Sequence, residues 1–425
     1  MTTAAEARWD NRWRHLPAFD PRGYRRVVAV AAHPDDETLG ASGCLQALHA
    51  AGARVDIVVA SDGEAAFPAL GEEDRAALGR RRRAELVESL RVQGLDQAAI
   101  HWLGLPDSGL SGHAEDLTEV LRELLADADC CVLPWPYDPH PDHSTVGACV
   151  LAAAPVTAHC WSYPIWMWHW TAEDSPDIPW RRAFTCALSD EQRARKSAGI
   201  KAFVSQLERG PDGSDPILPP DVLEHFDRDH EVLFRESRAQ SAPIARFSEL
   251  YAAQADPWQT EDSWYERRKR QTLLAALPRE HYRHAIEPAC GTGTLTAELA
   301  RRADRVSAFD AVADVVTATQ RRQLPGVTVA QAILPAGFPD ETADLVVLSE
   351  ILYYLSDEDL RKTVDNAITS LASGGDLVLA HWRPWAPEAT RDGAEAHELV
   401  AARPELSTVV EHRDEEFLLH VLRRQ

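Results

Sequence analysis

The chain has 425 residues, of which 45% are hydrophobic and 26% are charged, and its formal net charge at pH 7 is −23. Single domains usually stop growing near ~250 residues, so we expect two domains, and the composition excludes a disordered or fibrous protein. Nucleic acid is an unfavourable partner, because its phosphate backbone repels a chain with this strong negative charge.

The cysteines and the hydropathy indicate the cellular compartment. Seven cysteines lie mostly in apolar runs, and none belongs to a Cys-x-x-Cys pair, which favours buried free thiols in a reducing environment over a disulfide framework. Residues 1–20 carry charges throughout and lack the apolar core of a signal peptide. No stretch approaches the ~18 apolar residues of a membrane span. We therefore expect a cytoplasmic protein without a membrane span, and its oligomeric state stays open.

Strands and helices alternate through the first half of the chain. A continuous apolar run at residues 27–32 predicts a strand buried on both faces. Further strands are expected at 54–60, 100–103, 130–134 and 158–163, with helices at 38–51, 80–91 and 116–125. This alternation predicts an open parallel α/β sheet. A Pro-, Gly- and Asp-rich loop at 209–216 follows late in this domain.

The alternation starts again in the second half. Strands are expected at 284–287, 306–310, 344–348 and 376–380, with helices at 294–301 and 312–321. Residues 408–411 and 417–421 predict an antiparallel pair at a sheet edge. We therefore expect two Rossmann-like, three-layer α/β domains, residues 1–245 and residues 246–425.

Two segments rich in His and Asp follow buried strands. The first reads Ala32-His33-Pro34-Asp35-Asp36-Glu37, and the second reads Trp135-Pro136-Tyr137-Asp138-Pro139-His140-Pro141-Asp142-His143. Because ligands gather at the carboxyl ends of parallel strands, both segments can converge on one point. Two imidazoles and one carboxylate leave one coordination position of Zn2+ open, as a catalytic zinc site requires. The pattern therefore predicts a catalytic metal site.

Five polar residues of these segments have an expected role. We assign His33, Asp36 and His143 as the metal ligands and Asp35 as the general base that takes a proton from the attacking water. His140 would stabilise the oxyanion or protonate the leaving amine. The same ligand set also suits a non-haem Fe(II) oxygenase, but an unligated carboxylate beside the metal favours hydrolysis.

These segments resemble the PIG-L/LmbE family of zinc N-deacetylases, over roughly residues 27–206. Further matching stretches are Arg82-Arg83-Ala84-Glu85-Leu86, Leu103-Gly104-Leu105-Pro106-Asp107 and Ser205-Gln206. The resemblance implies hydrolysis of an N-acyl group, usually the N-acetyl group of an N-acetylglucosamine-like sugar or glycoconjugate. It also implies that Arg82 helps to hold the substrate, whereas the neighbouring arginines form a solvated helix face.

An aromatic run at residues 161–170 has two interpretations. Rings such as Tyr163 and Trp166 could stack on the apolar face of a sugar, or the run could form a core or interface cluster. We expect at most two of its rings to face the substrate.

A glycine-rich loop in the second half joins an expected strand to an expected helix. It reads Ile286-Glu287-Pro288-Ala289-Cys290-Gly291-Thr292-Gly293-Thr294. The glycines let the backbone approach a ligand closely, and Asp310, at the end of the next strand, can accept hydrogen bonds from ribose hydroxyls. This arrangement alone fits either a dinucleotide or S-adenosyl-L-methionine (SAM).

The sequence of this loop resembles motif I of class I SAM-dependent methyltransferases. This resemblance implies that SAM is bound by Glu287, Gly291, Gly293 and Asp310. The resemblance places the adenine edge at Gln331 and Ala332 and the methyl-transfer centre after the fourth strand. Three further segments resemble NodS-like methyltransferases. They are Asp256-Pro257-Trp258, Ser263-Trp264-Tyr265-Glu266-Arg267-Arg268-Lys269 and Ser349-Glu350-Ile351-Leu352-Tyr353-Tyr354.

The NodS-like family N-methylates a deacetylated glucosamine, and the resemblance implies that Tyr265 and Arg268 close over SAM. The family's usual acid at the end of the third strand is absent, since Gln331 stands there. That difference puts the adenine contacts in doubt.

The two chemistries can act in sequence, because an amide nitrogen is a poor nucleophile and a freed amine is a good one. The sequence therefore predicts deacetylation followed by N-methylation, with Glu350, Tyr354 and His381 as candidate residues near the transferred methyl group. Two alternatives remain: a deacetylase fused to an O-methyltransferase of the same pathway, and a scaffold protein in which one site has decayed.

Overall fold

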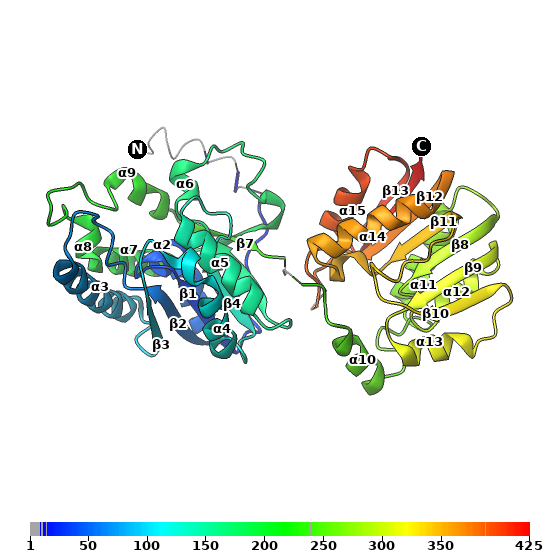
Figure 1. The fold of residues 1–425 in the computed structure, drawn as a ribbon, viewed down its shortest axis with the longest axis horizontal. Helices are drawn as coiled ribbons and strands as arrows, with labels where there is room; N and C mark the ends of the chain where they lie inside the picture. Colours follow the sequence, from blue (N-terminus) through cyan, green and yellow to red (C-terminus); the bar gives the residue numbers. More distant parts are fainter. Residues whose placement is uncertain (1–8, 10–11, 14, 238–239, 387) are drawn as a thin grey trace. The chain divides into compact units, whose positions relative to one another are not determined.

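The structure is a computed structural model that describes residues 9, 12–13, 15–237, 240–386 and 388–425. Part of the segment 1–20 therefore lies outside the described residues. The chain divides into two compact units, Met1–Glu236 and Ser237–Gln425, which are shown in Figure 1. This division falls earlier than the expected 245/246 boundary, because the Ala242 amide already donates to the carbonyl of Tyr354 (2.8 Å) in the second unit.

The first unit is built on a seven-stranded sheet in the order β3-β2-β1-β4-β5-β7-β6. Its strands are β1 (Arg26–Ala31), β2 (Arg54–Ser61), β3 (Ala99–Leu105), β4 (Cys130–Pro134), β5 (His159–Tyr163), β6 (Ala183–Ala187) and β7 (His230–Arg235). The first five strands in this order, from β3 through β2, β1 and β4 to β5, pair in parallel, as the sequence predicts. Strand β7 is antiparallel to both β5 and β6. The antiparallel β6–β7 edge was not expected from the sequence.

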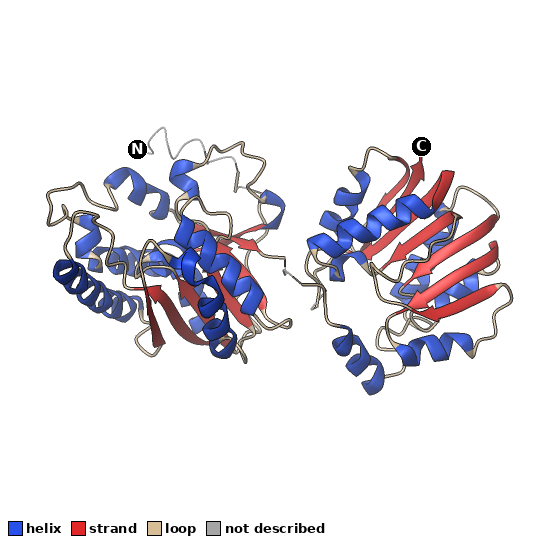
Figure 2. Cartoon of the chain, in the orientation of Figure 1, coloured by secondary structure: helices blue, strands red, loops and turns tan. Residues whose placement is uncertain are grey.

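Helices cover both faces of this sheet (Figure 2). The principal ones are α2 (Asp36–Ala50), α3 (Glu72–Gln93), α4 (Ala114–Leu124), α5 (Pro141–Ala153), α6 (Met167–Trp170) and α7 (Asp190–Ala202), followed by α8 (Val204–Leu207) and α9 (Pro220–Leu223). Along β1, Val27 and Ala29 join the core that contains α2 and α3 side chains, whereas Val28 and Val30 join the core that contains α4 and α5 side chains. This alternation produces three layers.

Helix α3 is longer than the expected 80–91 segment. It starts after Gly71 with three acidic residues in its first turn, which favour the positive end of a helix. It ends at Gly94, whose left-handed φ of 76° terminates the helix without a side-chain clash. The arginine run, Arg80 to Arg83, therefore lies in mid-helix, and its members point to different sides.

The second unit has a seven-stranded sheet in the order β10-β9-β8-β11-β12-β14-β13. Its strands are β8 (Tyr282–Pro288), β9 (Ala303–Asp310), β10 (Val327–Gln331), β11 (Ala343–Ser349), β12 (Leu371–Trp382), β13 (Leu406–Arg413) and β14 (Phe417–Arg424). The first five strands are parallel, and β14 is antiparallel to β12 and β13. The antiparallel terminal pair confirms the expectation from the sequence.

Helices again flank the sheet on both sides (Figure 2). They are α10 (Ile244–Ala253), α11 (Trp264–Ala276), α12 (Thr294–Leu299), α13 (Ala313–Gln320), α14 (Asp357–Ser370) and α15 (Gly393–Ala401). All seven cysteines of the chain are buried and free of disulfides, as expected. Among the described residues, no helix is both long and apolar enough to cross a membrane.

Candidate active sites

The first candidate site lies where β1 and β4 end. These strands pair in parallel, with Val27 opposite Cys130, so their carboxyl ends share one edge of the sheet. His33 follows β1, Asp36 opens α2, and His143 lies in the first turn of α5. The structure brings these three expected metal ligands together, with one ligand atom of each within 4.8 Å of the others, and all three are buried.

The separations within this triad suit a tetrahedral metal ion. The His143 Nε2 atom lies 3.3 Å from His33 Nδ1 and 3.2 Å from Asp36 Oδ1, and His33 Nδ1 lies 3.6 Å from Asp36 Oδ2. Two ligand atoms bound ~2.1 Å from a tetrahedral zinc ion are about 3.4 Å apart. The donor set and its spacing therefore fit zinc, with one coordination position left for water or substrate.

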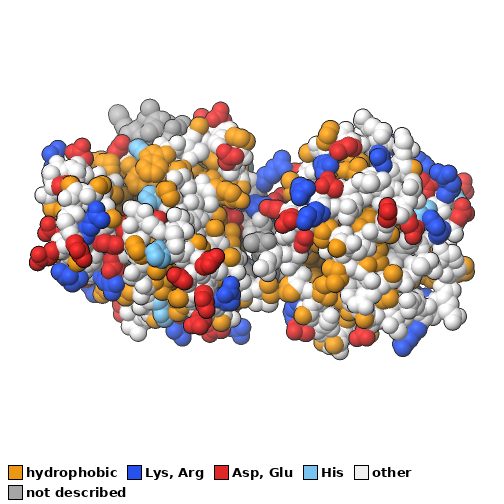
Figure 3. All heavy atoms as spheres, viewed as in Figure 1, with side chains coloured by type: hydrophobic (Ala, Val, Ile, Leu, Met, Phe, Trp, Pro, Cys, Tyr) orange, Lys and Arg blue, Asp and Glu red, His pale blue; other side chains and the backbone are white. Residues whose placement is uncertain are grey.

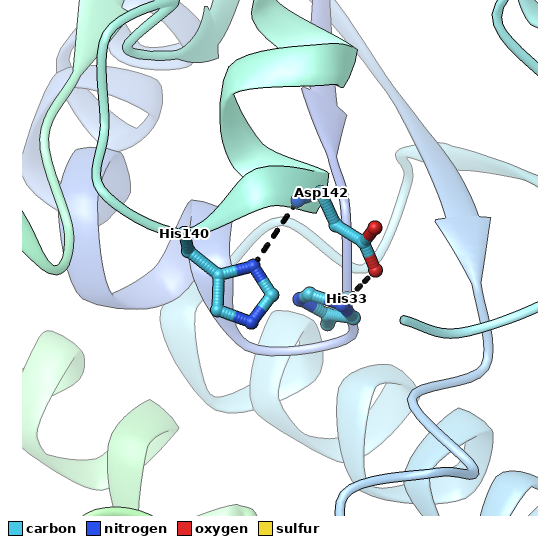
Figure 4. Close-up of side chains that lie close together, drawn as sticks. All are labelled: His33, His140 and Asp142. Carbon is cyan, nitrogen blue, oxygen red and sulfur yellow. Dashed lines mark hydrogen bonds and ion pairs between the residues drawn. The ribbon is translucent and has the colours of Figure 1, made fainter. Parts of the chain in front are cut away.

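The far ring nitrogen of each histidine faces carboxylates. His33 Nε2 lies 3.1 Å from Asp107 and 3.3 Å from Asp142, the latter shown in Figure 4. His143 Nδ1 lies 3.3 Å from Asp138 Oδ1. Such outer carboxylates fix the tautomer and orientation of a metal-bound histidine. Burial lowers the pKa of His143, but Asp36 and Asp138 outweigh it and raise the pKa to about 9, so the pocket favours a cation.

These outer carboxylates were not assigned roles from the sequence. Asp107 follows the third strand, and its carboxylate accepts a hydrogen bond from the Ala65 amide (2.8 Å). The Asp142 carboxylate accepts hydrogen bonds from the amides of Ser108 (2.8 Å) and Leu110 (3.2 Å). An acid directly after a parallel strand was the available signal for Asp107. Asp138 and Asp142 stand within the second His/Asp segment, where spacing alone does not separate ligands from supporting residues.

Asp35, the expected general base, is buried beside the triad and does not belong to it. Burial raises the pKa of Asp35 to about 6, although Arg82 opposes this shift. The Arg82 Nη2 atom lies 3.1 Å from Asp35 Oδ2, and the same guanidinium donates to the carbonyls of Gly63 (2.9 Å) and Pro34 (3.2 Å). Arg82 is itself buried, and the contacts of its guanidinium are with Asp35 and these two carbonyls.

His140 lies beside His33 (Figure 4). Its ring centroid is 5.2 Å from that of His33 and 4.6 Å from that of His143. Burial and the neighbouring histidines lower the pKa of His140 to about 4, so the ring is neutral near pH 7. Because His140 Nδ1 accepts a hydrogen bond from the Asp142 amide (3.3 Å), its proton is on Nε2, which can donate to an oxyanion.

The aromatic run divides between core and surface. Tyr163 is fully buried, and its hydroxyl donates to the carbonyl of Val30 (2.8 Å). The expectation that Tyr163 contacts substrate is therefore wrong, because its ring packs against Gly40 of α2 inside the core. Trp166 is partly exposed and stacks on Trp170, with ring centroids 4.3 Å apart.

The second candidate site is a cavity of about 790 Å³ in the second unit. Its wall includes Glu287, Gly291 and Asp310 from the glycine loop and the end of β9, together with Tyr265, Ala332 and Glu350. The glycine loop turns sharply, with left-handed φ values of 53° at Gly291 and 80° at Gly293. A Cβ at Gly293 would lie 2.5 Å from Thr319, so this glycine permits helix packing, whereas Gly291 borders the cavity.

Two carboxyl groups of this cavity suit a nucleoside cofactor. Burial raises the pKa of Glu287 to about 8, and its Oε2 atom has no hydrogen-bond partner among the described residues. Asp310 accepts hydrogen bonds from the amides of Gly291 and Val312, both at 3.0 Å, which orient its carboxylate at the strand end. An unpaired buried carboxyl oxygen and an oriented one fit the amino and hydroxyl donors of SAM.

Some expected cofactor contacts lie elsewhere. Arg268 is outside the cavity wall, because it ion-pairs with Asp414 and Glu416 on the opposite side of α11. Gln331 is also outside the wall and donates to the carbonyl of Ala311 (3.0 Å). The expected side-chain contacts of these two residues with SAM are therefore not supported, whereas Tyr265 and Ala332 line the cavity as expected.

Glu350 borders the cavity at the end of β11, with a left-handed φ of 55° that is uncommon for a residue with a side chain. Its carboxylate accepts hydrogen bonds from Lys269, Tyr265, Tyr353 and the Trp382 amide. Four donors occupy the roughly four lone-pair sites of a carboxylate. Glu350 therefore holds Tyr265 and Lys269 in place and has little capacity left for a substrate proton.

His381 is not a cavity residue, so its expected catalytic position is wrong. It is fully buried, and its Nε2 atom accepts hydrogen bonds from the amides of Ile351 (3.3 Å) and Leu352 (3.1 Å). Its Nδ1 atom lies 2.8 Å from His397 Nε2. The buried histidine thus stabilises the loop after β11 through these backbone hydrogen bonds. Tyr354 does line the cavity.

Comparison with known proteins agrees with both sites. Residues 28–154 match the family described as GlcNAc-PI de-N-acetylase (PIG-L), and residues 285–375 match the family described as methyltransferase domain. The first half resembles the 1D-myo-inositol 2-acetamido-2-deoxy-alpha-D-glucopyranoside deacetylase 2 of Saccharopolyspora erythraea. The two are 30% identical over 208 residues, which is 41% of this chain and 70% of that protein.

The second half resembles nodulation protein S of Rhizobium tropici, with 32% identity over 132 residues, or 30% of this chain. The match spans only 56% of the length of that relative. Among solved structures, the N-methyltransferase NodS from Bradyrhizobium japonicum in complex with S-adenosyl-L-homocysteine is 24% identical. That alignment covers 42% of this chain and 97% of NodS, with a TM-score of 0.39.

Proposed function

We propose a two-step reaction for this chain, whose N-terminal unit belongs to the PIG-L family of de-N-acetylases and whose C-terminal unit is a SAM-dependent methyltransferase domain resembling NodS. The first unit hydrolyses the N-acetyl group of an N-acetylglucosamine-like amino sugar or glycoconjugate. The second unit transfers a methyl group to the amine that this hydrolysis frees. The observation that carries the proposal is the buried His33–Asp36–His143 triad with the unligated carboxylate of Asp35 beside it.

In the deacetylase unit, His33, Asp36 and His143 hold the metal. Zinc bound there supplies Lewis acidity, which lowers the pKa of water and polarises an amide carbonyl. Asp35, whose carboxylate is ion-paired with Arg82, accepts the proton of the attacking water. The Nε2–H group of His140 donates to the developing oxyanion. Together these groups stabilise the charge that amide hydrolysis creates.

In the methyltransferase unit, the glycine loop, Glu287 and Asp310 hold SAM, which supplies an electrophilic methyl group. Tyr265 closes one wall, and Glu350 fixes its hydroxyl at 3.4 Å. The chain's contribution to methyl transfer is mainly alignment of the acceptor amine in this cavity. Tyr353 and Tyr354 line the acceptor side of the β11 end.

The proposal has a direct test. Purified protein is incubated with zinc, SAM and a simple N-acetylglucosaminide, and products are followed by mass spectrometry. We expect loss of the acetyl group and then a gain of one methyl group on nitrogen. The His33→Ala variant should lose deacetylation but still methylate the free amine. The Asp310→Ala variant should deacetylate the substrate but leave the free amine unmethylated. His113→Ala, a surface histidine of the same unit, is the matched control.

The second candidate is a deacetylase joined to an O-methyltransferase, and a methyl group found on oxygen would select it over N-methylation. Failure of both variants to separate the two activities would contradict a bifunctional enzyme. We also propose a reducing cytoplasmic location, which the seven buried free thiols support.

A further inference from the structure

Helix α6 presents an unusual surface beside the metal triad. Met167 and Trp168 are buried and attach this short helix to the core. Trp166 and Trp170 are one helical turn apart and stack nearly parallel, with an interplanar angle of 14°. Trp170 remains 54% exposed, which is rare for so large an aromatic side chain.

One carboxylate ties this aromatic pair to the metal site. Asp138 Oδ2 accepts hydrogen bonds from the amides of Ile165 (3.0 Å), Trp166 (3.0 Å) and Met167 (3.4 Å), which open α6. The other oxygen of Asp138 lies 3.3 Å from Nδ1 of the ligand His143. The start of α6 is therefore connected to the metal position through two side chains, Asp138 and His143.

The surface around α6 is rich in hydrophobic side chains, with histidines among them. Figure 3 shows hydrophobic side chains gathered on the N-terminal unit around α6. Tyr137, which directly precedes Asp138, is 69% exposed. A platform for a second sugar needs polar groups beside the ring that bond its hydroxyls, whereas a surface of this kind suits a flat apolar group.

We propose that the Trp166–Trp170 stack is a subsite for the aglycone of the substrate, a flat and apolar group linked to the amino sugar whose acetyl group meets the metal triad. This inference rests on the proposed deacetylase function. The exposed face of Trp170 stacks on the aglycone, and the bonds of Asp138 to the start of α6 connect this stack to the side of the triad where the amide reacts.

Binding measurements test the subsite independently of turnover. The zinc-loaded full chain carrying Asp35→Asn, which should be inactive, is titrated with the 2-naphthyl and methyl glycosides of N-acetylglucosamine in a calorimeter. We expect the naphthyl glycoside to bind about tenfold tighter, as one aromatic stack allows. Adding Trp170→Ala should remove this preference without changing the Kd of the methyl glycoside, and Trp170→Phe should restore part of it.

Trp264→Ala is the matched control, because Trp264 is 67% exposed in the other unit and lies outside its cavity wall. An unchanged ratio of the two Kd values in Trp170→Ala overturns the inference, as does absence of naphthyl glycoside binding. The inference is also overturned if N,N′-diacetylchitobiose, and not the naphthyl glycoside, binds more tightly than the methyl glycoside. If binding depends on Trp170 but the chain with Asp35 intact hydrolyses neither glycoside, the subsite stands and the proposed function fails.

Discussion

The Arg82 guanidinium and the Asp35 carboxylate form a buried ion pair 3.1 Å apart, in which each side chain is less than 10% exposed. The family resemblance assigned Arg82 to substrate binding. We propose from this pairing that Arg82 positions the proposed base, and this role has measurable consequences.

Arg82→Ala should destabilise the N-terminal unit by about 3–5 kcal/mol, because it leaves the Asp35 carboxylate buried without its counter-charge. Deacetylation should also fall steeply in the fraction that remains folded. Arg82→Lys should restore part of the stability, since it keeps the charge but loses the bonds to two carbonyls. Urea unfolding and initial rates measure both effects. Arg80→Ala, on the exposed face of the same helix, is the control and should change neither.

Asp138→Asn should weaken zinc binding about 10–100-fold, because the outer carboxylate that orients His143 loses its charge. The amide side chain keeps its size and can still accept from the α6 backbone. Competition with a chromogenic chelator measures the zinc Kd. Asp62→Asn, which weakens a partly buried ion pair with Arg83, should leave the Kd unchanged. An equal loss in both variants would contradict the assigned role of Asp138.

Removing the metal should affect one unit and one activity. Each unit has its own hydrophobic cores, so we expect two unfolding transitions in calorimetry. Zinc in hundredfold excess over its Kd stabilises the folded state by about 2.7 kcal/mol, and a chelator should lower only the N-terminal transition. Deacetylation should stop, while methylation of the free amine continues. Loss of methylation on chelation would mean that the second site also needs a metal.

His381→Ala should act on stability more than on catalysis. The substitution removes the acceptor for two backbone amides and opens a cavity in a fully buried site, which should cost about 2–4 kcal/mol. Methyl-transfer rates of the folded enzyme should stay within a few-fold of wild type. The surface variant His281→Ala should leave both values unchanged. Full stability with abolished methyl transfer would restore the catalytic role first expected for His381.

Glu287 should make the stability of the C-terminal unit depend on pH. Burial raises its pKa from 4.5 to about 8, so its contribution to stability is fully present below pH 4.5. It is lost as the pH rises through about 8. Glu287→Gln should therefore raise the Tm of this unit by a few °C at pH 8 and by much less at pH 5. Glu298→Gln, on the surface of α12, should show no such difference between the two pH values.

Local patterns predicted most of the parallel sheets. Strands such as β1 and β4 carry uninterrupted apolar runs because both faces are covered by helices. The β6–β7 edge escaped prediction because β6 is short and only partly buried, so its sequence has neither a continuous apolar run nor clear alternation. Its place depends on β7, which pairs with it only after the chain has returned across the sheet.

The sequence by itself determined the His33–Asp36–His143 triad, since His33 and Asp36 stand three residues apart after one strand and His143 follows the adjacent parallel strand. It also determined the glycine loop, because backbone geometry there is set by residue type. Tertiary structure alone decided that Arg82 faces Asp35, that Arg268 turns away from the cavity and that His381 lies behind it. Residue type sets which contacts a side chain can make, but packing against distant segments decides which way that side chain points.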